Sequence, residues 1–396
     1  MRNRVLLALL LFSVTGLVVL AAGKFFILQN VSVTPNVPLD DAQSASRVIT
    51  DLAGRKIRLP RQVNRIVLLR GMGLYDLAAL LGDEVEQKLI GWDSSLQASD
   101  RDAYERFVQR FRGLKAVPLL GDSLRNGVSA EAVLALRPDV VIGGTYMIGQ
   151  TATLDQLEQA RVPVVLLSSD DPFRDPQESL KLLGQVFGQE QRAAEIVDWV
   201  NREISLLQKR MERLEGPIPS IYLEAGNTGP EKYGNTFGSN LQKQRVHWGS
   251  LLSQLRCQNV GEEISGPFGM GVIQPEYLLT RNPDVIVITG ACWTAFPESL
   301  HLGYGADQAK ARQTLSSFLA RPGWSEMNAV KSRRVYGLNT RLGAHIMSFA
   351  AAQQLAQWLY PDEFKDLDPV QRLQEFHERF MPIPLTGTWM TELEAP

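Results

Sequence analysis

One unit of sequence occurs twice in this chain, at residues 129–145 and again at residues 274–290. Each copy predicts a short amphipathic helix, a Pro-Asp break, a buried apolar strand and a glycine-rich turn. Helices that alternate with buried strands are typical of parallel α/β sheets. The chain has 396 residues, which is enough for two domains. We therefore expect two similar α/β lobes with the functional site in a cleft between them.

The composition excludes some classes of partner. Hydrophobic residues make up 44% of the chain, charged residues 21%, and the formal net charge is −2. A nucleic-acid-binding protein usually carries a basic patch or a strongly basic domain, and this chain shows neither. We expect no nucleic-acid partner.

The chain has two cysteines, Cys257 and Cys292. No CxxC motif and no Cys/His spacing of the zinc-binding kind occurs, so the sequence predicts no metal site. Two alternatives stay open for the thiols. They form a disulfide if the compartment is oxidising, or they are two buried free thiols that act as small hydrophobic groups.

The first residues have the pattern of an export signal. Residues 1–4 carry positive charge, and residues 5–23 form an uncharged apolar run that ends in Ala-Ala-Gly. Residues 1–23 therefore predict a cleaved signal peptide, or else an uncleaved membrane anchor, and a periplasmic location. Residues 24–47 lack periodicity and indicate a linker arm.

The remainder divides into a lobe at 48–187, a helix at 188–216 and a second lobe at 217–396 that ends in an extended charged tail. The helix is predicted from apolar residues at three- and four-residue spacing between Gly188 and Gly216. Its ~27 residues at ~1.5 Å each give a rod of roughly 40 Å, long enough to bridge two lobes. A further helix is expected at 239–255.

No catalytic signature is present. The chain lacks GxxxxGK[ST], HExxH and GxSxG, and its four histidines are scattered. The sequence therefore favours a binding protein over an enzyme.

Aromatic and cationic residues follow the predicted strands, where open α/β sheets bind ligands. Arginine suits anionic groups because its planar fork donates two hydrogen bonds, and Trp and Tyr offer broad apolar surface. These residues predict a site for a bulky anionic ligand, against the alternatives of core packing for the aromatics and surface charge for the arginines. The candidates are Arg70, Met72, Tyr75, Trp92 and Tyr146 in the first lobe and Asn227, Tyr233, Trp293, Arg341 and His345 in the second.

Glu131 and Glu276 stand at the same register of the repeated unit, seven residues before its proline. A glutamate in a first helical turn is favoured by the helix dipole alone. The alternative is that each lobe presents one carboxylate to a partner with two-fold symmetry.

Several motifs resemble those of the class III periplasmic substrate-binding proteins of ABC importers. They are Thr50-Asp-Leu-Ala-Gly54, Leu59-Pro60, Arg65-Ile-Val67, the two repeated units, the long helix, and Trp324 with Ala329-Val-Lys331 and Arg334-Val-Tyr336. The similarity runs from about residue 48 to about residue 360.

The resemblance implies two lobes bridged by one rigid helix, with little hinge motion when the ligand enters the cleft. It implies a ferric siderophore as the ligand, with haem or cobalamin as alternatives, and it gives Glu131 and Glu276 the role of docking on the two permease subunits in the inner membrane. We expect a monomer with no resident cofactor. A two-lobed enzyme related to chelatases is the alternative from another class.

Overall fold

Both copies of the repeated unit fold in the same way in the computed structural model, which describes residues 46–123, 127–149 and 152–394. In the first copy α5 (Ala130–Ala135) leads to β7 (Val140–Gly144), and in the second α10 (Pro275–Arg281) leads to β13 (Val285–Gly290). Each helix is followed by a residue with positive φ directly before the proline, Arg137 at 48° and Asn282 at 43°. Proline cannot continue a helix, so the chain turns there into the strand.

The aspartate of each Pro-Asp pair holds the neighbouring strand. Oδ2 of Asp139 accepts hydrogen bonds from the backbone N–H groups of Asn64 and Arg65 at 2.8 and 2.9 Å, just before β3 (Ile66–Leu68). Oδ2 of Asp284 accepts from the backbone N–H and the Oγ of Ser220 at 2.8 and 2.7 Å, where β9 (Ser220–Ala225) begins. The motif therefore aligns two strands as well as ending a helix.

Two separate sheets result. The N-terminal sheet has the order β4 (Leu89–Trp92), β3, β7, β8 (Val164–Leu167), and all its pairs are parallel. In the C-terminal sheet β13 lies between β9 and β14 (Val335–Asn339), as β7 lies between β3 and β8. Around that parallel centre stand β10 (Asn235–Phe237), β11 (Gln258–Asn259), β12 (Met270–Val272) and β15 (Met390–Glu392). The predicted two-lobed α/β fold is confirmed.

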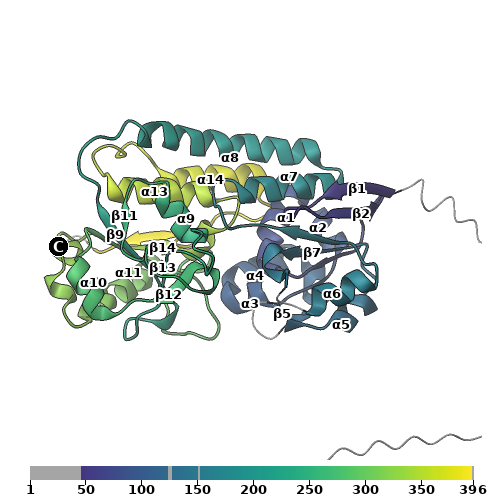
Figure 1. Ribbon diagram of the computed structural model, residues 1–396, viewed down its shortest axis with the longest axis horizontal. Coiled ribbons are helices and arrows are strands. Elements are labelled where there is room, and N and C mark those ends of the chain that lie inside the picture. Colours follow the sequence, from purple (N-terminus) through teal and green to yellow (C-terminus); the bar gives the residue numbers. More distant parts are fainter. Residues whose placement is uncertain (1–45, 124–126, 150–151, 395–396) are drawn as a thin grey trace, which may run out of the picture. The chain divides into compact units, whose positions relative to one another are not determined.

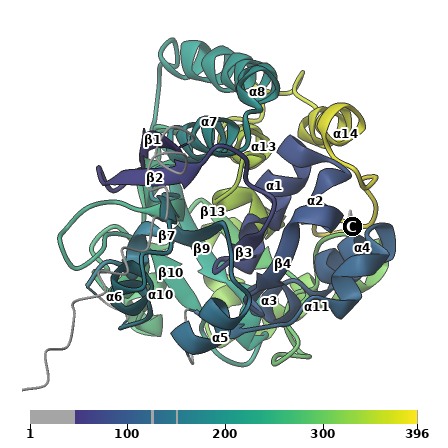
Figure 2. The ribbon, with the colours of Figure 1, turned by 90° about the vertical axis from the view of Figure 1, so that its right-hand side faces the viewer.

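Shorter elements complete the lobes. The N-terminal lobe adds β1 (Ser46–Thr50), β2 (Lys56–Pro60), α1 (Leu74–Leu81), α2 (Glu84–Lys88), α3 (Ser95–Ser99), α4 (Arg101–Arg110), β5 (Gly121–Asp122), β6 (Gly127–Val128), α6 (Ala152–Gln159) and α7 (Asp175–Phe187). The C-terminal lobe adds α9 (His247–Ser253), α11 (Gln308–Ser317) and α12 (Asn328–Lys331). The antiparallel hairpin β1–β2 lies beside α7, where Arg47 donates to the carbonyl of Val186 (Figure 2).

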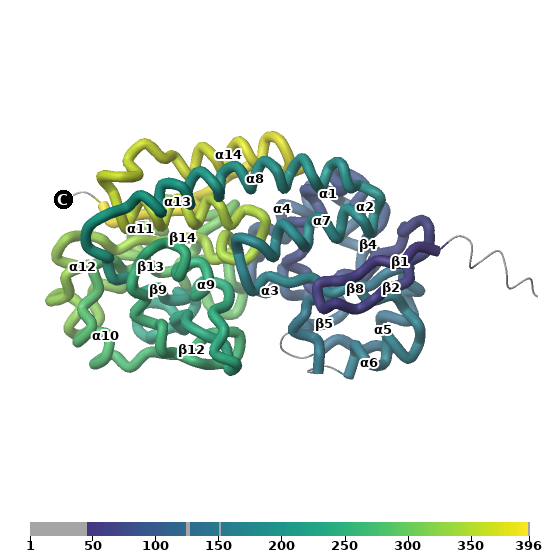
Figure 3. Tube along the Cα trace, turned by 45° about the horizontal axis from the view of Figure 1, so that its top comes forward, coloured from purple at the N-terminus to yellow at the C-terminus, as the bar shows by residue number. Residues whose placement is uncertain are grey.

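The connecting helix is shorter than predicted and is not alone. Helix α8 spans Glu190–Met211, because Gly188 at φ 68° ends α7 and the chain leaves the helix before Gly216. Its 22 residues give about 33 Å at ~1.5 Å per residue. Helices α13 (Ser348–Leu359) and α14 (Pro369–Phe380) run beside it (Figures 1 and 3).

A buried carboxylate joins these three helices. Glu203 of α8 accepts hydrogen bonds from Gln353 of α13 at 2.9 Å and from Arg372 Nε of α14 at 3.0 Å. Trp199 of α8 packs against Phe349 and Phe376 with ring centroids 5.0 and 5.7 Å apart. Helix α8 is the predicted bridge between the lobes, and α13 and α14 pack against it.

The tail after Leu359 packs against this bridge and is not an appendage. Its helix α14 contacts α8, its last strand β15 pairs with β14, and the carbonyl of Pro382 accepts a hydrogen bond from Arg110 of the N-terminal lobe at 3.3 Å. The tail therefore reaches back to the first lobe.

The predicted signal peptide at 1–23 and most of the predicted arm at 24–47 lie outside the described residues. The first described element, β1, begins at Ser46, inside the range assigned to the arm. Within the described residues no helix is both long and apolar enough to cross a membrane.

The helix expected at 239–255 is confined to α9. Residues before it turn back on themselves, with the Asn240 side chain accepting from the N–H groups of Gln242 and Gln244 at 3.0 Å. Both cysteines lie in the described part and are free, so the disulfide alternative is wrong.

Candidate ligand-binding site

A cavity of about 390 Å³ lies between the two lobes. The N-terminal lobe contributes Arg70, Met72, Ser95, Tyr146 and Ser169 to its wall. The C-terminal lobe contributes Phe237, His247, Trp248, Phe268, Met270, Thr340, Arg341, Gly343, Ala344 and His345. A second hollow of about 290 Å³ adjoins it and shares Tyr146, His247 and Phe268. We call the first cavity the inter-lobe pocket.

Strand ends supply the charged and aromatic groups of this pocket. Arg70 follows β3, Tyr146 follows β7, and Arg341 follows β14. Because parallel strands end at the same edge of a sheet, these side chains reach the space between the lobes together.

Arg341 is a partly buried cation with few partners. Its Nη1 lies 2.7 Å from the Sδ of Met72, and its Nε is buried without a hydrogen-bond partner among the described residues. Burial lowers the pKa of Arg341. The negative charge of Asp100 raises this pKa, and the positive charge of Arg70 lowers it further. A thioether is a weak acceptor, so Arg341 retains donors for a ligand.

Arg70 lines the pocket. Its guanidinium group makes no hydrogen bond and no ion pair with any of the described residues. Arg70 and Arg341 are both positively charged and repel each other, so Arg70 adds to the lowering of the pKa of Arg341 that burial causes. Two guanidinium groups, one from each lobe, therefore face one cavity.

A hydrogen-bond chain holds the ring of Tyr146 in place. The Tyr146 hydroxyl lies 2.9 Å from Ser123 Oγ, which donates to Asp93 Oδ2 at 2.5 Å. Oδ1 of Asp93 accepts from the backbone N–H of Gly71 at 2.6 Å. Burial raises the pKa of Tyr146, so its hydroxyl stays protonated at neutral pH.

His345 lines the pocket with its ring almost fully buried. Its Nδ1 lies 3.7 Å from Oδ2 of Asp76, and burial lowers its pKa. The imidazole is therefore neutral near pH 7, and its neighbour Asp76 belongs to the core of the N-terminal lobe.

Tyr75 and Trp92 are not on the pocket, contrary to prediction. Both side chains are 0% exposed. The Tyr75 hydroxyl donates to Asp100 at 2.8 Å, and burial raises the pKa of Asp100 to about 6. The ring of Trp92 stacks on Tyr104 at 5.5 Å. Both rings fill the core because their strand and helix turn these positions away from the cleft.

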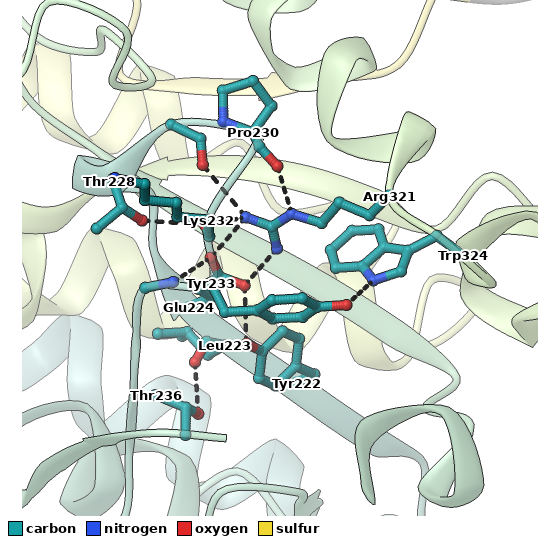
Figure 4. Close-up of polar contacts among 12 residues, drawn as sticks. Tyr222, Leu223, Glu224, Thr228, Pro230, Lys232, Tyr233, Thr236, Arg321 and Trp324 are labelled. Atoms are coloured by element: carbon teal, nitrogen blue, oxygen red, sulfur yellow. Dashed lines mark hydrogen bonds and ion pairs between the residues drawn. The ribbon is translucent and has the colours of Figure 1, made fainter. Parts of the chain in front are cut away.

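Tyr233 also lies elsewhere. Its ring packs against the guanidinium of Arg321 at 4.4 Å, and its hydroxyl accepts from Trp324 Nε1 at 2.9 Å (Figure 4). Arg321 in turn forms a two-bond ion pair with the buried Glu224, at 2.8 and 2.9 Å. These contacts attach the loop after β9 to the core of the C-terminal lobe. Tyr233 belongs to this loop and therefore lies away from the cleft.

Asn227 and Trp293 are likewise absent from the wall of the inter-lobe pocket. Asn227 lies in a short 3-10 turn, Gly226–Thr228, that follows β9. Trp293 lies in the segment after β13, where the N–H of Thr294 donates to the carbonyl of Ala98 in the other lobe at 3.0 Å. The second copy of the repeated unit thus ends in a contact between lobes.

The sequence did not point to the residues around α9. His247 and Trp248 fall inside the helix predicted at 239–255, and Phe268 carries no strand-end signal. His247 and Phe268 adopt positive φ, 49° and 56°. A Cβ on Gly343 would stand 2.4 Å from the Trp248 ring. Only glycine at this position leaves room for the indole to line the pocket.

The two repeat glutamates are exposed and lie in the first turns of α5 and α10. Glu131 accepts a hydrogen bond from Ser129 Oγ at 2.6 Å, which lowers its pKa. The two carboxylates therefore occupy matching places in the two lobes.

Known proteins resemble this chain along most of its length. Residues 79–342 match a family described as periplasmic binding protein. The ABC transporter substrate-binding lipoprotein YvrC of Bacillus subtilis is 25% identical over 325 residues, covering 80% of this chain and 87% of YvrC. The molybdate-binding protein MolA of Haemophilus influenzae is 24% identical over 361 residues, covering 85% of this chain and 91% of MolA. The structure of the TroA-like periplasmic binding protein FepB from Veillonella parvula is similar with a TM-score of 0.80 at 29% identity, covering 88% of this chain and 99% of FepB.

Proposed function

The chain belongs to the periplasmic binding protein family, as a substrate-binding protein of an ABC transporter, and we propose that its substrate is a ferric siderophore carried to a permease in the inner membrane. Its relatives are transport proteins and not enzymes. We further propose that the chain acts in the periplasm, with residues 1–23 directing its export.

One observation carries the choice of ligand. Arg70 and Arg341 face the same pocket from opposite lobes, and neither guanidinium is paired with a carboxylate in the described structure. Two unpaired cations repel each other, so an anion placed between them gains from both. Many ferric siderophore complexes carry negative charge on a broad, partly apolar body.

The size and lining of the pocket support a bulky ligand. A volume of about 390 Å³ falls in the range of sites for drug-sized molecules. Phe237, Trp248 and Phe268 add aromatic surface beside the two arginines. A tetrahedral oxyanion of the kind bound by MolA would fill only part of this space.

Haem is the second candidate, because a histidine on the pocket could serve as an axial ligand. His247 is half-buried and lines both hollows. Burial lowers the pKa of His247, which leaves the imidazole neutral and able to coordinate iron.

The docking role proposed for Glu131 and Glu276 rests on their matching positions and exposure. A permease dimer with one basic socket in each subunit would accept one glutamate from each lobe. The pair would then orient the loaded pocket toward the transport pathway.

A ligand panel tests the proposal. The mature protein is titrated with ferric catecholate and ferric hydroxamate siderophores, haem, cobalamin and molybdate, with thermal shift and calorimetry as readouts. We expect a ferric siderophore to bind more tightly than the other ligands and to lose affinity in Arg341→Gln. A Soret shift that disappears in His247→Ala would support haem instead, and tight binding of molybdate alone would refute the siderophore.

A further inference from the structure

Away from the inter-lobe pocket, three metal-binding side chains converge where the lobes meet. Asp102 lies on α4 of the N-terminal lobe, and Cys292 and His301 lie after β13 in the C-terminal lobe. A carboxylate oxygen, the Sγ and a ring nitrogen from these residues all lie within 4.8 Å of one another. None of the three lines the inter-lobe pocket.

Backbone contacts between the lobes hold these ligand atoms in position. The N–H of Arg101 donates to the carbonyl of Cys292 at 3.0 Å, and the N–H of Gly305 donates to Oδ2 of Asp102 at 3.0 Å. Cys292 and Asp102 are thus each placed by a bond that crosses from one lobe to the other. Such fixed backbones favour a preformed site.

An ion pair alone does not account for the cluster. Nε2 of His301 lies 2.5 Å from Oδ2 of Asp102, which explains two of the three members. Cys292 adds a thiol that interacts with both partners, although a thiol is only a weak hydrogen-bond donor. As a thiolate, however, it is a strong metal ligand.

The set of donors selects a class of ion. Sulfur, imidazole nitrogen and one carboxylate oxygen together suit Zn²⁺ and similar borderline ions, whereas Mg²⁺ and Ca²⁺ prefer oxygen alone. Three protein ligands with a water in the fourth position complete a tetrahedron. His301 has 43% of its side chain exposed and Asp102 has 14%, so an ion and its water can enter from solvent.

We infer that Asp102, Cys292 and His301 form a binding site for Zn²⁺ that ties the two lobes together. The ion takes the place of the proton between His301 and Asp102, whose donor atoms move apart by about 1 Å to reach it. The protons of the Cys292 thiol and of the imidazolium pass to solvent on binding. Since the ligands come from both lobes, the bound ion opposes their separation.

Cobalt titration of the mature, tag-free protein tests this site, because Co²⁺ replaces Zn²⁺ and its bond to a thiolate gives a charge-transfer absorption band. We expect the band in the unaltered protein and in Cys257→Ser, the matched control, and its loss in Cys292→Ser. Replacing even an outer partner of a metal ligand typically costs about 10- to 100-fold in affinity. We therefore expect His301→Gln to weaken Zn²⁺ binding by about 100-fold or more.

Melting curves in chelator show whether a variant is folded. If Cys292→Ser melts as the unaltered protein does in chelator, and only the unaltered protein gains stability from Zn²⁺, the site is supported. A missing cobalt band, a band kept in Cys292→Ser, or an equal Zn²⁺ shift in both proteins would overturn it.

Discussion

The two copies of the repeated unit share one fold but end differently. In the first, the chain after β7 places Tyr146 in the inter-lobe pocket. In the second, the chain after β13 carries Cys292 and Thr294 into contact with the other lobe. A Cβ on Gly144 would stand 2.2 Å from the Tyr146 ring, and one on Gly290 would stand 2.6 Å from the carbonyl oxygen of Leu300. The missing side chain therefore makes room for an aromatic ring at Gly144 and for a backbone carbonyl at Gly290.

The shared half of the unit is the half that each lobe needs in order to fold. Asp139 and Asp284 align neighbouring strands in the same way, and Glu131 and Glu276 keep matching exposed positions. The strand end is free to differ, because it faces the space between the lobes. The segment after the strand thus supplies a pocket residue in one lobe and a contact between lobes in the other.

The largest effect on transport is expected where the copies are alike. Glu131→Lys with Glu276→Lys should reduce uptake by a cell carrying the importer by roughly 100-fold, since like charges brought together across an interface cost several kcal/mol. Each single charge reversal should also reduce uptake, but by less than the double variant does. Uptake of labelled ligand measures this, and an equal loss of ligand affinity in the purified double variant would contradict the docking role.

The buried ion pairs of the two lobes should differ. Arg321→Met should lower the free energy of unfolding by about 3–5 kcal/mol, because it leaves Glu224 charged and unpaired in the core. Arg55→Met in the N-terminal lobe should cost about 1–2 kcal/mol, since Asp51 keeps its bonds from backbone N–H groups. Urea unfolding measures both, and equal losses would remove this difference between the lobes.

The tail should make stability depend on pH through His377. Burial lowers its pKa to about 4, and its ring bonds the Tyr304 hydroxyl at 2.9 Å. The unfolded chain takes up this proton near pH 6.5 and the folded chain only near pH 4. Stability should therefore fall by about 3 kcal/mol as the pH drops through that window.

His377→Asn removes this titration and keeps one donor and one acceptor. Unfolding curves between pH 4 and pH 7 should show a flatter dependence on pH in the variant. Parallel curves for the two proteins would count against the buried, neutral histidine.

The two pocket arginines should contribute alike although they come from different lobes. Arg70→Gln and Arg341→Gln should each weaken binding of an anionic ligand by about 1.5–3 kcal/mol, the range for a hydrogen bond to a charged group. Calorimetry with the ligand found in the panel measures both. Unchanged affinity in either variant would exclude that arginine from the site.

The smallest effect compares the two strand ends directly. Tyr146→Ala should weaken ligand binding by about 0.5–1.5 kcal/mol, as expected for one aromatic contact, whereas Trp293→Ala should leave affinity unchanged. If Trp293→Ala has the larger effect, the second copy also contributes to the pocket.

Local patterns were enough to predict much of this protein. Strand periodicity, the Pro-Asp breaks and the position of Arg341 after its strand depend on neighbouring residues, so the lobes and part of the site followed from them. The same rule failed for Tyr75 and Trp92, because it indicates a strand end and not the direction of each side chain.

Long-range contacts decided the remainder. The tail packs on the connecting helix because Arg372 bonds to Glu203. These two residues are 169 positions apart in the chain. His301 and Asp102 are 199 residues apart, so no spacing rule could reveal their cluster with Cys292. Periodicity reports which face of an element is apolar, but only the packing of distant elements determines which polar groups meet.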